Sequence, residues 1–220
     1  MKVKQVKLIY FSPTGTTQKV LESIAKGITV EDVEYINLTP PEGAQQTIPP
    51  FSDELVIMGA PVYGGRLPVV AINRFKQLKA GNTLAILIVV YGNREFEDAL
   101  LELKKLAIEL GFNPIAGGAF IGAGRFPYEG GARSMTVSPV TKEDTCTVCG
   151  TCAGVCPTAA ISINGSVATK IELCIRCSAC IKNCPTGARV WEDSTMKNIA
   201  NWLNENCSTR KEPQIFGIDV

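Results

Sequence analysis

Eight of the nine cysteines in this chain fall into two runs of identical spacing. Each run has the form C-x2-C-x2-C-x3-C-P, and the second begins 28 residues after the first. The members are Cys146, Cys149, Cys152 and Cys156 before Pro157, and Cys174, Cys177, Cys180 and Cys184 before Pro185. Three thiolates at this spacing let a tight loop wrap one corner of an iron–sulfur cubane, and the fourth thiolate must come from elsewhere in the chain.

Disulfides and zinc are the alternative uses of so many cysteines. A disulfide framework needs an oxidising compartment and is typical of small secreted chains. This chain has 220 residues, and its start, MKVKQVKLIYF, has too short an apolar part and no small-residue cleavage site for a secretory signal. Zinc pairs of the CxxC type rarely repeat as four-cysteine runs ending in Pro, and the lack of His removes Cys2His2 sites. The spacing therefore favours iron–sulfur clusters.

The repeated runs resemble those of two-cluster bacterial ferredoxins, in which the fourth cysteine of each run crosses to the other cluster. The resemblance implies two 4Fe-4S clusters. It assigns one to Cys146, Cys149, Cys152 and Cys184, and the other to Cys174, Cys177, Cys180 and Cys156. Between the runs, residues 161–164 and 167–169 meet at an Asn-Gly pair and predict a short hairpin. The ninth cysteine, Cys207, falls on an apolar helical stripe, so we expect a buried apolar residue there.

A hydroxyl-rich loop with one glycine follows an apolar run near the start of the chain. Residues 6–11 predict a buried strand, and the apolar residues of 20–28 have helical spacing. The loop between them reads Ser12-Pro13-Thr14-Gly15-Thr16-Thr17. Loop amides, hydroxyls and a helix N-terminus together bind anions, although such a loop can also be an ordinary helix cap and turn.

This loop resembles the phosphate loop of flavodoxins, with the pattern S/T-x-T-G-x-T directly after the first strand. The resemblance implies that the loop binds the phosphate of FMN without a positive side chain. The implied ligands are Ser12, Thr14, Gly15, Thr16 and Thr17.

Strands and helices alternate through the first 121 residues. Residues 33–38, 55–60, 83–91 and 115–121 predict further strands, and residues 69–78 and 95–110 predict helices. Strands separated by helices of this length form a parallel sheet covered on both faces. The expected fold class is α/β, a flavodoxin-like doubly wound parallel five-stranded sheet in the order 2-1-3-4-5. A small α+β ferredoxin domain with two 4Fe-4S clusters and a C-terminal helix follow it.

Two more loops follow the third and fourth strands, at the carboxyl ends where this fold binds its ligand. They resemble the flavin-ring loops of flavodoxins, and Gly64 or Gly65 can let a peptide turn its carbonyl towards the ring. The implied FMN contacts in the first loop are Pro61, Val62, Tyr63, Gly64 and Gly65. Those in the second are Tyr91, Gly92, Asn93, Arg94 and Phe96, with Tyr91 or Phe96 as the stacking residue. Ordinary turns are the alternative, because Gly, Pro and Asn favour turns anyway.

The expected organisation has three parts. Residues 1–137 form the flavodoxin-like FMN-binding domain, 138–193 the ferredoxin domain, and 194–220 a helix and tail that pack on the first domain. The apolar stripe of that helix consists of Met196, Ile199, Ala200, Trp202, Leu203 and Cys207. A solvated tail is the alternative. Residues 122–139 form a linker or a third loop that reaches the flavin through Phe126 or Tyr128.

The charge and the resemblance together indicate a function. A net charge of +1 offers no long-range attraction for nucleic acid or anionic lipid, and the longest apolar run, 84–91, is too short to span a membrane. We therefore expect a cytoplasmic protein without nucleic-acid or membrane partners. The whole chain resembles flavodoxin-like/bacterial-ferredoxin fusion proteins of anaerobes. That resemblance implies an electron-transfer iron–sulfur flavoprotein, a low-potential carrier that passes single electrons between two 4Fe-4S clusters and FMN.

The same resemblance implies a class of partner and leaves two alternative functions open. The expected partner is a redox protein that donates or accepts electrons, and a homodimer is compatible with this expectation. One alternative is a flavin-dependent reductase of a quinone, nitro compound or other small acceptor, with the clusters as an internal relay and an open flavin edge. Another is a redox-sensing or structural module without turnover. Direct nicotinamide use is not indicated, because GAGR at 122–125 lacks the third Gly and the helix of that fingerprint.

Overall fold

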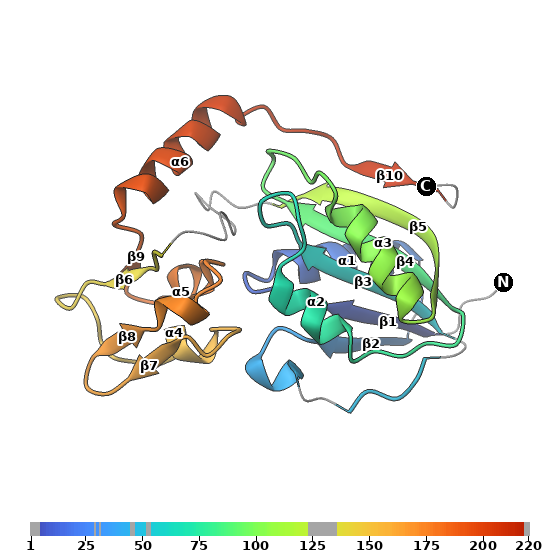
Figure 1. Ribbon diagram of the computed structural model, residues 1–220, viewed down its shortest axis with the longest axis horizontal. Helices are drawn as coiled ribbons and strands as arrows, with labels where there is room; N and C mark the ends of the chain where they lie inside the picture. Colours follow the sequence, from blue (N-terminus) through green and yellow to red (C-terminus); the bar gives the residue numbers. More distant parts are fainter. Residues whose placement is uncertain are drawn as a thin grey trace.

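Two modules lie side by side in the computed structural model of the chain (Figure 1). The structure describes residues 5–28, 30, 32–44, 47–51, 54–122 and 136–217. An α/β domain precedes residue 122, and a smaller module with the eight repeated cysteines follows residue 136. The proposed third flavin loop through Phe126 or Tyr128 lies outside the described residues.

The α/β domain is built on five parallel strands in the order β2-β1-β3-β4-β5. The strands are β1 (Gln5–Tyr10), β2 (Asp32–Asn37), β3 (Leu55–Pro61), β4 (Thr83–Tyr91) and β5 (Phe112–Ile121). Every residue of β3 is buried, as expected for the centre of a parallel sheet that is covered on both faces. The strand order is that of flavodoxin, so the predicted fold class is confirmed.

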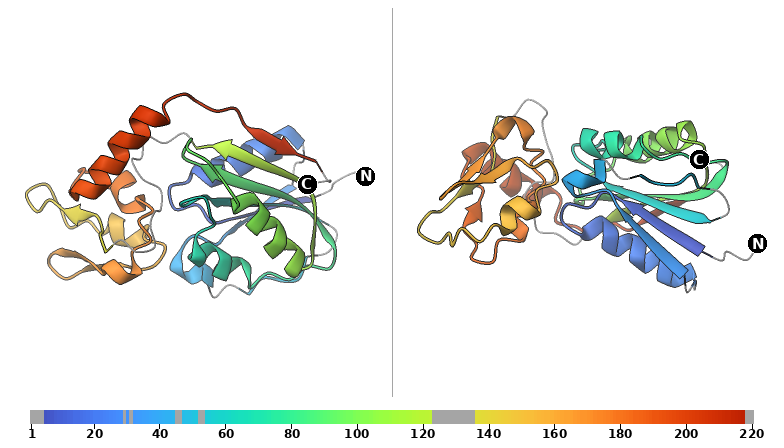
Figure 2. Two further views of the ribbon diagram at one scale, coloured as in Figure 1. Left: turned by 45° about the horizontal axis from the view of Figure 1, so that its top comes forward. Right: turned by 90° about the horizontal axis from the view of Figure 1, so that it is seen from below.

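Helices cover both faces of this sheet, as the view from below in Figure 2 shows. Helix α1 (Thr16–Ile28) packs on one face, where Leu21 and Ala25 belong to the apolar core. On the other face lie α2 (Val69–Phe75) and α3 (Ala99–Glu109), with a short 3-10 helix, η1 (Pro41–Ala44), beside α2. Helix α3 begins four residues later than the predicted 95, because residues 92–98 form the loop described below.

The second module has two small antiparallel pairs and two short helices related by the sequence repeat. Its elements are β6 (Val140–Thr141), α4 (Thr151–Gly154), β7 (Ile161–Ile163), β8 (Val167–Thr169), η2 (Ile171–Leu173), α5 (Ala179–Lys182) and β9 (Arg189–Val190). Strand β6 pairs with β9, and β7 pairs with β8. The predicted hairpin around Gly165 is therefore confirmed.

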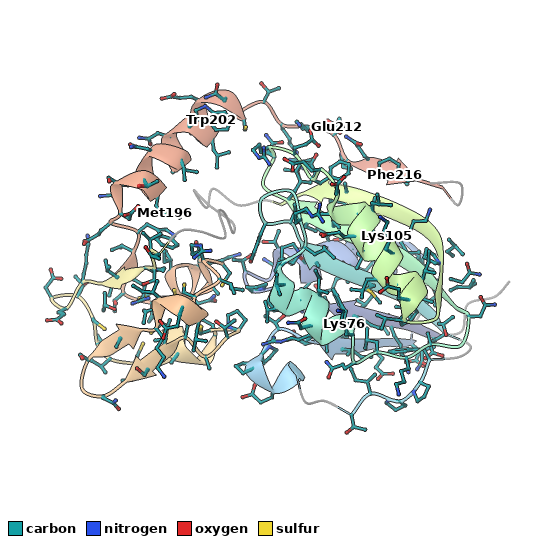
Figure 3. All side chains as sticks on the ribbon, in the orientation of Figure 1. Lys76, Lys105, Met196, Trp202, Glu212 and Phe216 are labelled. Atoms are coloured by element: carbon teal, nitrogen blue, oxygen red, sulfur yellow. The ribbon has the colours of Figure 1, made fainter. Side chains whose placement is uncertain are left out.

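The C-terminal helix does not bury the apolar stripe that was expected to pack on the first domain. Helix α6 (Ser194–Asn206) lies above the cysteine module in Figure 1, and the chain that follows it crosses to the edge of the sheet. Of its apolar stripe only Met196 is buried, and Trp202 is 52% exposed (Figure 3). The segment instead reaches the first domain through β10 (Gln214–Phe216), a sixth strand that pairs antiparallel with β5.

Candidate functional site

Four cysteines gather around one pocket of the second module. Cys174, Cys177 and Cys180 come from the second run, and Cys156 is the last cysteine of the first. Burial raises the pKa of all three second-run thiols, and the nearby charge of Cys156 raises each of them further. Buried thiolates without a cation are costly, whereas the irons of a cluster supply the missing positive charge. We call Cys156, Cys174, Cys177 and Cys180 the inner set.

The remaining four cysteines form a more exposed group, the outer set. Its members are Cys146, Cys149, Cys152 and Cys184. Burial raises the pKa of Cys152, and Cys184 adds to the effect, so these two lie close together although they belong to different runs. Cys149 is exposed, and a hydrogen bond with Thr151 lowers its pKa.

One cysteine of each run lies near cysteines of the other run. Cys156 stands with the second run, and Cys184 stands beside Cys152 of the first. Among the described residues, no three His, Cys, Asp or Glu side chains are close enough to hold a single metal ion. A cubane spreads its thiolates over four irons, so its ligands lie farther apart than those of one tetrahedral ion. The four thiols of the inner set, which line one pocket, fit a cubane.

The predicted phosphate loop is a structured turn at the start of α1. The amide of Gly15 donates to the Ser12 carbonyl at 3.0 Å, and Gly15 has a φ of 74°, which favours glycine. The Ser12 hydroxyl accepts from the Gln18 amide at 3.1 Å, so it acts as a helix cap. Thr17 is buried, with 2% exposure, whereas Thr14, Gly15 and Thr16 remain half-buried at the helix N-terminus. An anion bound by this loop would therefore contact Thr14, Gly15 and Thr16 rather than Thr17.

The first predicted ring loop forms a tight turn with positive φ at both central glycines. Gly64 and Gly65 have φ values of 60° and 78°, and the Tyr63 amide donates to the Arg66 carbonyl at 2.8 Å. A type I′ turn of this kind favours glycine at both positions. A Cβ at Gly65 would lie 2.0 Å from Glu97 Oε2 and 3.0 Å from Glu97 Cβ, so the Glu97 side chain would have to shift. The two ring loops are thus in contact.

The second ring loop holds the C-terminal segment. The Asn93 amide nitrogen donates to the carbonyls of Cys207 at 2.6 Å and Thr209 at 2.9 Å, and its oxygen accepts from the Lys211 amide at 2.9 Å. The Arg94 carbonyl accepts from Lys211 Nζ at 2.6 Å. The sequence predicts that Asn93 and Arg94 contact the flavin. It gives no sign of their hydrogen bonds with the C-terminal tail.

Tyr91 lies in the core rather than on the surface of this loop. It is 1% exposed, and its ring centroid is 5.5 Å from that of Phe96. Phe96 in turn contacts Phe216 of β10, with 6.3 Å between ring centroids. Burial raises the pKa of the Tyr91 hydroxyl. Tyr91 therefore supports the loop from beneath and is not placed to stack on a flavin, which corrects one of the two stacking candidates. Phe96 and Tyr63 remain partly exposed.

The inner set faces the α/β domain through three contacts that the sequence did not predict. Arg74 of α2 is 5% exposed, and it donates to the carbonyls of Leu38, Thr39 and Pro157. Lys182 Nζ donates to the carbonyl of Thr14 in the phosphate loop at 2.5 Å. Ile175, between two cysteines of the inner set, packs against the apolar core of the first domain.

A second link joins this junction to the phosphate loop. The Thr39 hydroxyl accepts from the Ser12 amide at 2.8 Å, while its carbonyl accepts from Arg74. A short series of hydrogen bonds therefore runs from the loop to Pro157, the neighbour of Cys156. No sequence motif indicates Thr39, Arg74 or Pro157 as contact residues. They come together only because the two modules pack against each other in the folded chain.

The fold and the cysteine sets define a flavodoxin-like α/β domain joined to an iron–sulfur module, a combination that supports a redox role. Residues 138–185 match the family of 4Fe-4S dicluster domains. No curated protein matches the chain. None of the described helices is long and apolar enough to cross a membrane.

Several solved structures are similar to the first domain. A putative flavoprotein from Bacteroides uniformis has 15% identity and a TM-score of 0.42, with 56% of this chain and 94% of that chain covered. A Fusobacterium nucleatum flavodoxin bound to flavin mononucleotide has 16% identity and a TM-score of 0.39, with 51% and 70% covered. Flavodoxin 1 from Bacillus cereus has 17% identity and a TM-score of 0.41, with 55% and 86% covered.

Proposed function

We propose that this protein is an electron-transfer iron–sulfur flavoprotein that passes single electrons between two 4Fe-4S clusters and FMN. The observation that carries the proposal is the contact between the cysteine module and the phosphate loop. Lys182, which lies between cysteines assigned to different clusters, donates to Thr14 of that loop. Arg74 ties Pro157 to the chain segment that holds Ser12.

The burial of the two sets indicates an order of transfer. Cys149 of the outer set is exposed, so a protein partner can approach the outer cluster closely. The inner set is more buried and lies towards the α/β domain, where Ile175 joins the core. Each cubane carries one electron at a time, and FMN accepts one or two. Electrons would therefore pass from a redox-protein donor to the outer cluster, then to the inner cluster and the flavin, or in the reverse direction.

The second ring loop favours a carrier over a reductase of small molecules. Asn93 and Arg94 of this loop bind the tail at Cys207, Thr209 and Lys211. A segment on this loop restricts the approach of a quinone or nitro compound to that side of the site. A reductase would instead reduce such acceptors at rates that depend on acceptor size.

Anaerobic reconstitution tests the proposal. We expect about eight irons and one FMN per chain, and electrons added by a small protein donor should appear on the clusters before the flavin in rapid-mixing visible spectra. EPR spectra of frozen samples from the same reaction identify the clusters. Protein that takes up zinc instead of iron, or that stays free of FMN, would exclude this function.

A further inference from the structure

Arg189 is a buried cation in the cysteine module. It is 3% exposed, and no carboxylate of the described residues lies within ion-pair distance of it. Its guanidinium donates to the Thr141 hydroxyl at 2.7 Å, the Thr169 hydroxyl at 2.8 Å and the Pro139 carbonyl at 2.9 Å. One of its terminal nitrogens lies 3.9 Å from Cys180 Sγ. Apart from the cysteine, its hydrogen-bond partners among the described residues are therefore neutral.

The internal repeat has an uncharged residue at the position that corresponds to Arg189. The offset of 28 residues that aligns the cysteine runs pairs Ala160-Ile161 with Ala188-Arg189. Ile161 is also buried, with 8% exposure. One half of the module thus has an aliphatic residue where the other half has a guanidinium. Burying an arginine in place of isoleucine is unfavourable unless a negative group compensates its charge.

The inner cysteine set supplies such a group when it binds a cluster. A cubane with four thiolate ligands has a net negative charge, and reduction adds one more unit of negative charge without making or breaking a ligand bond. A cation at a sulfur of this cluster therefore stabilises the reduced form more than the oxidised form. The outer set has Ile161 at the corresponding position of the repeat. The charge of Arg189 also lowers the pKa of Cys152 in the outer set, but among the described thiols its guanidinium is within hydrogen-bond distance of Cys180 alone.

We propose that Arg189 is the buried counter-charge of the inner cluster and raises its reduction potential above that of the outer cluster. The proposal rests on the electron-transfer function above. One electron leaves a reduced protein donor, passes through the outer cluster and reduces the inner cluster, while Arg189 stays protonated throughout. Arg189, which is not one of the motif cysteines, thereby favours electron transfer in the direction of the flavin.

An EPR-monitored redox titration of the holoprotein tests this role. Arg189→Gln removes the charge but keeps a hydrogen-bonding side chain, and Arg189→Lys keeps the charge. We expect Arg189→Gln to lower the equilibrium constant for reduction of one cluster about tenfold. This corresponds to a reduction potential that is about 59 mV lower for a one-electron couple. Arg189→Lys should retain most of the wild-type value. Lys170→Gln, which removes an exposed charge from the same module, should leave both potentials unchanged because solvent screens it.

The outcomes separate charge from structure. Arg189→Gln protein with full iron content and both wild-type potentials would overturn the proposal. Equal shifts in the Gln and Lys variants would also overturn it, since they would indicate a role in shape alone. Arg189→Ile, which restores the symmetry of the repeat, should lower the same potential as Arg189→Gln. If Arg189→Ile does not assemble clusters, the Gln and Lys pair still decides. Wild-type protein without cluster signals would instead refute the proposed function itself.

Discussion

Replacement of Arg74 by methionine should destabilise the α/β domain more than loss of a surface arginine with two ion pairs. Arg74 has no ion pair among the described residues, yet it is 5% exposed and donates to three carbonyls. Methionine matches the length of the buried stem but offers no donor. Arg74→Met therefore leaves the carbonyls of Leu38, Thr39 and Pro157 without the partner that they have now.

The magnitude follows from the burial and the acceptors. A hydrogen bond from a charged donor contributes about 1.5–3 kcal/mol, and two of the three acceptors belong to the α/β domain. Burial lowers the pKa of Arg74, which shows that enclosing the charge has a cost of its own. Methionine avoids that cost, so part of the loss is offset. We expect the free energy of unfolding of the α/β domain to fall by about 2–3 kcal/mol.

Arg66→Met is the matched control. Arg66 pairs with Asp98 at 3.1 Å and Glu102 at 2.6 Å, but its side chain is 47% exposed. Exposed ion pairs contribute about 0–1 kcal/mol each, so this variant should lose about 1 kcal/mol. Urea unfolding followed by far-UV circular dichroism gives both values from the midpoint and slope. An Arg74→Met loss no larger than that of Arg66→Met would refute the argument that unpaired buried carbonyls decide the cost.

Three further predictions concern the phosphate loop and the tail. Lys182 donates to Thr14 of the loop that is expected to bind the FMN phosphate, so its ammonium charge would favour an anion there. Lys182→Gln should therefore raise the dissociation constant of FMN about threefold but leave that of riboflavin unchanged in fluorescence titrations. Equal losses for both ligands would indicate that Lys182 only tethers the loop. Asn93→Ala removes three hydrogen bonds to the tail, so amide exchange at residues 214–216 should become at least about tenfold faster, and unchanged exchange would contradict this. The hydrogen bond from Lys211 lowers the pKa of Glu95, so attachment of the tail is complete above the unfolded pKa of this carboxyl and weakens as the pH falls through the folded value. Glu95→Gln should abolish this acid dependence of exchange at 214–216, once intrinsic rates are subtracted.

The sequence predicted the elements whose signals are local. The five parallel strands, the helices between them and the hairpin at Gly165 follow from periodicity and turn residues within short windows. Strand β10 was not predicted, since three residues have no periodicity and pair only because the edge of β5 is open. The burial of Tyr91 was also missed. It ends an apolar run, and the residues that cover it, Phe96 and then Phe216, come from a loop and from the distant tail.

The sequence by itself determined the chemistry that this chain can hold: two cysteine runs spaced for cubanes and a hydroxyl-rich loop between a strand and a helix. Only the tertiary structure decided which cysteine set faces the α/β domain and which stays exposed. Arg74 and Pro157 are 83 positions apart, and Lys182 and Thr14 are 168 apart. Contacts over such separations depend on how whole modules close on each other. No spacing rule within one segment contains that information, because the free energy that selects the contacts comes from burial across the junction.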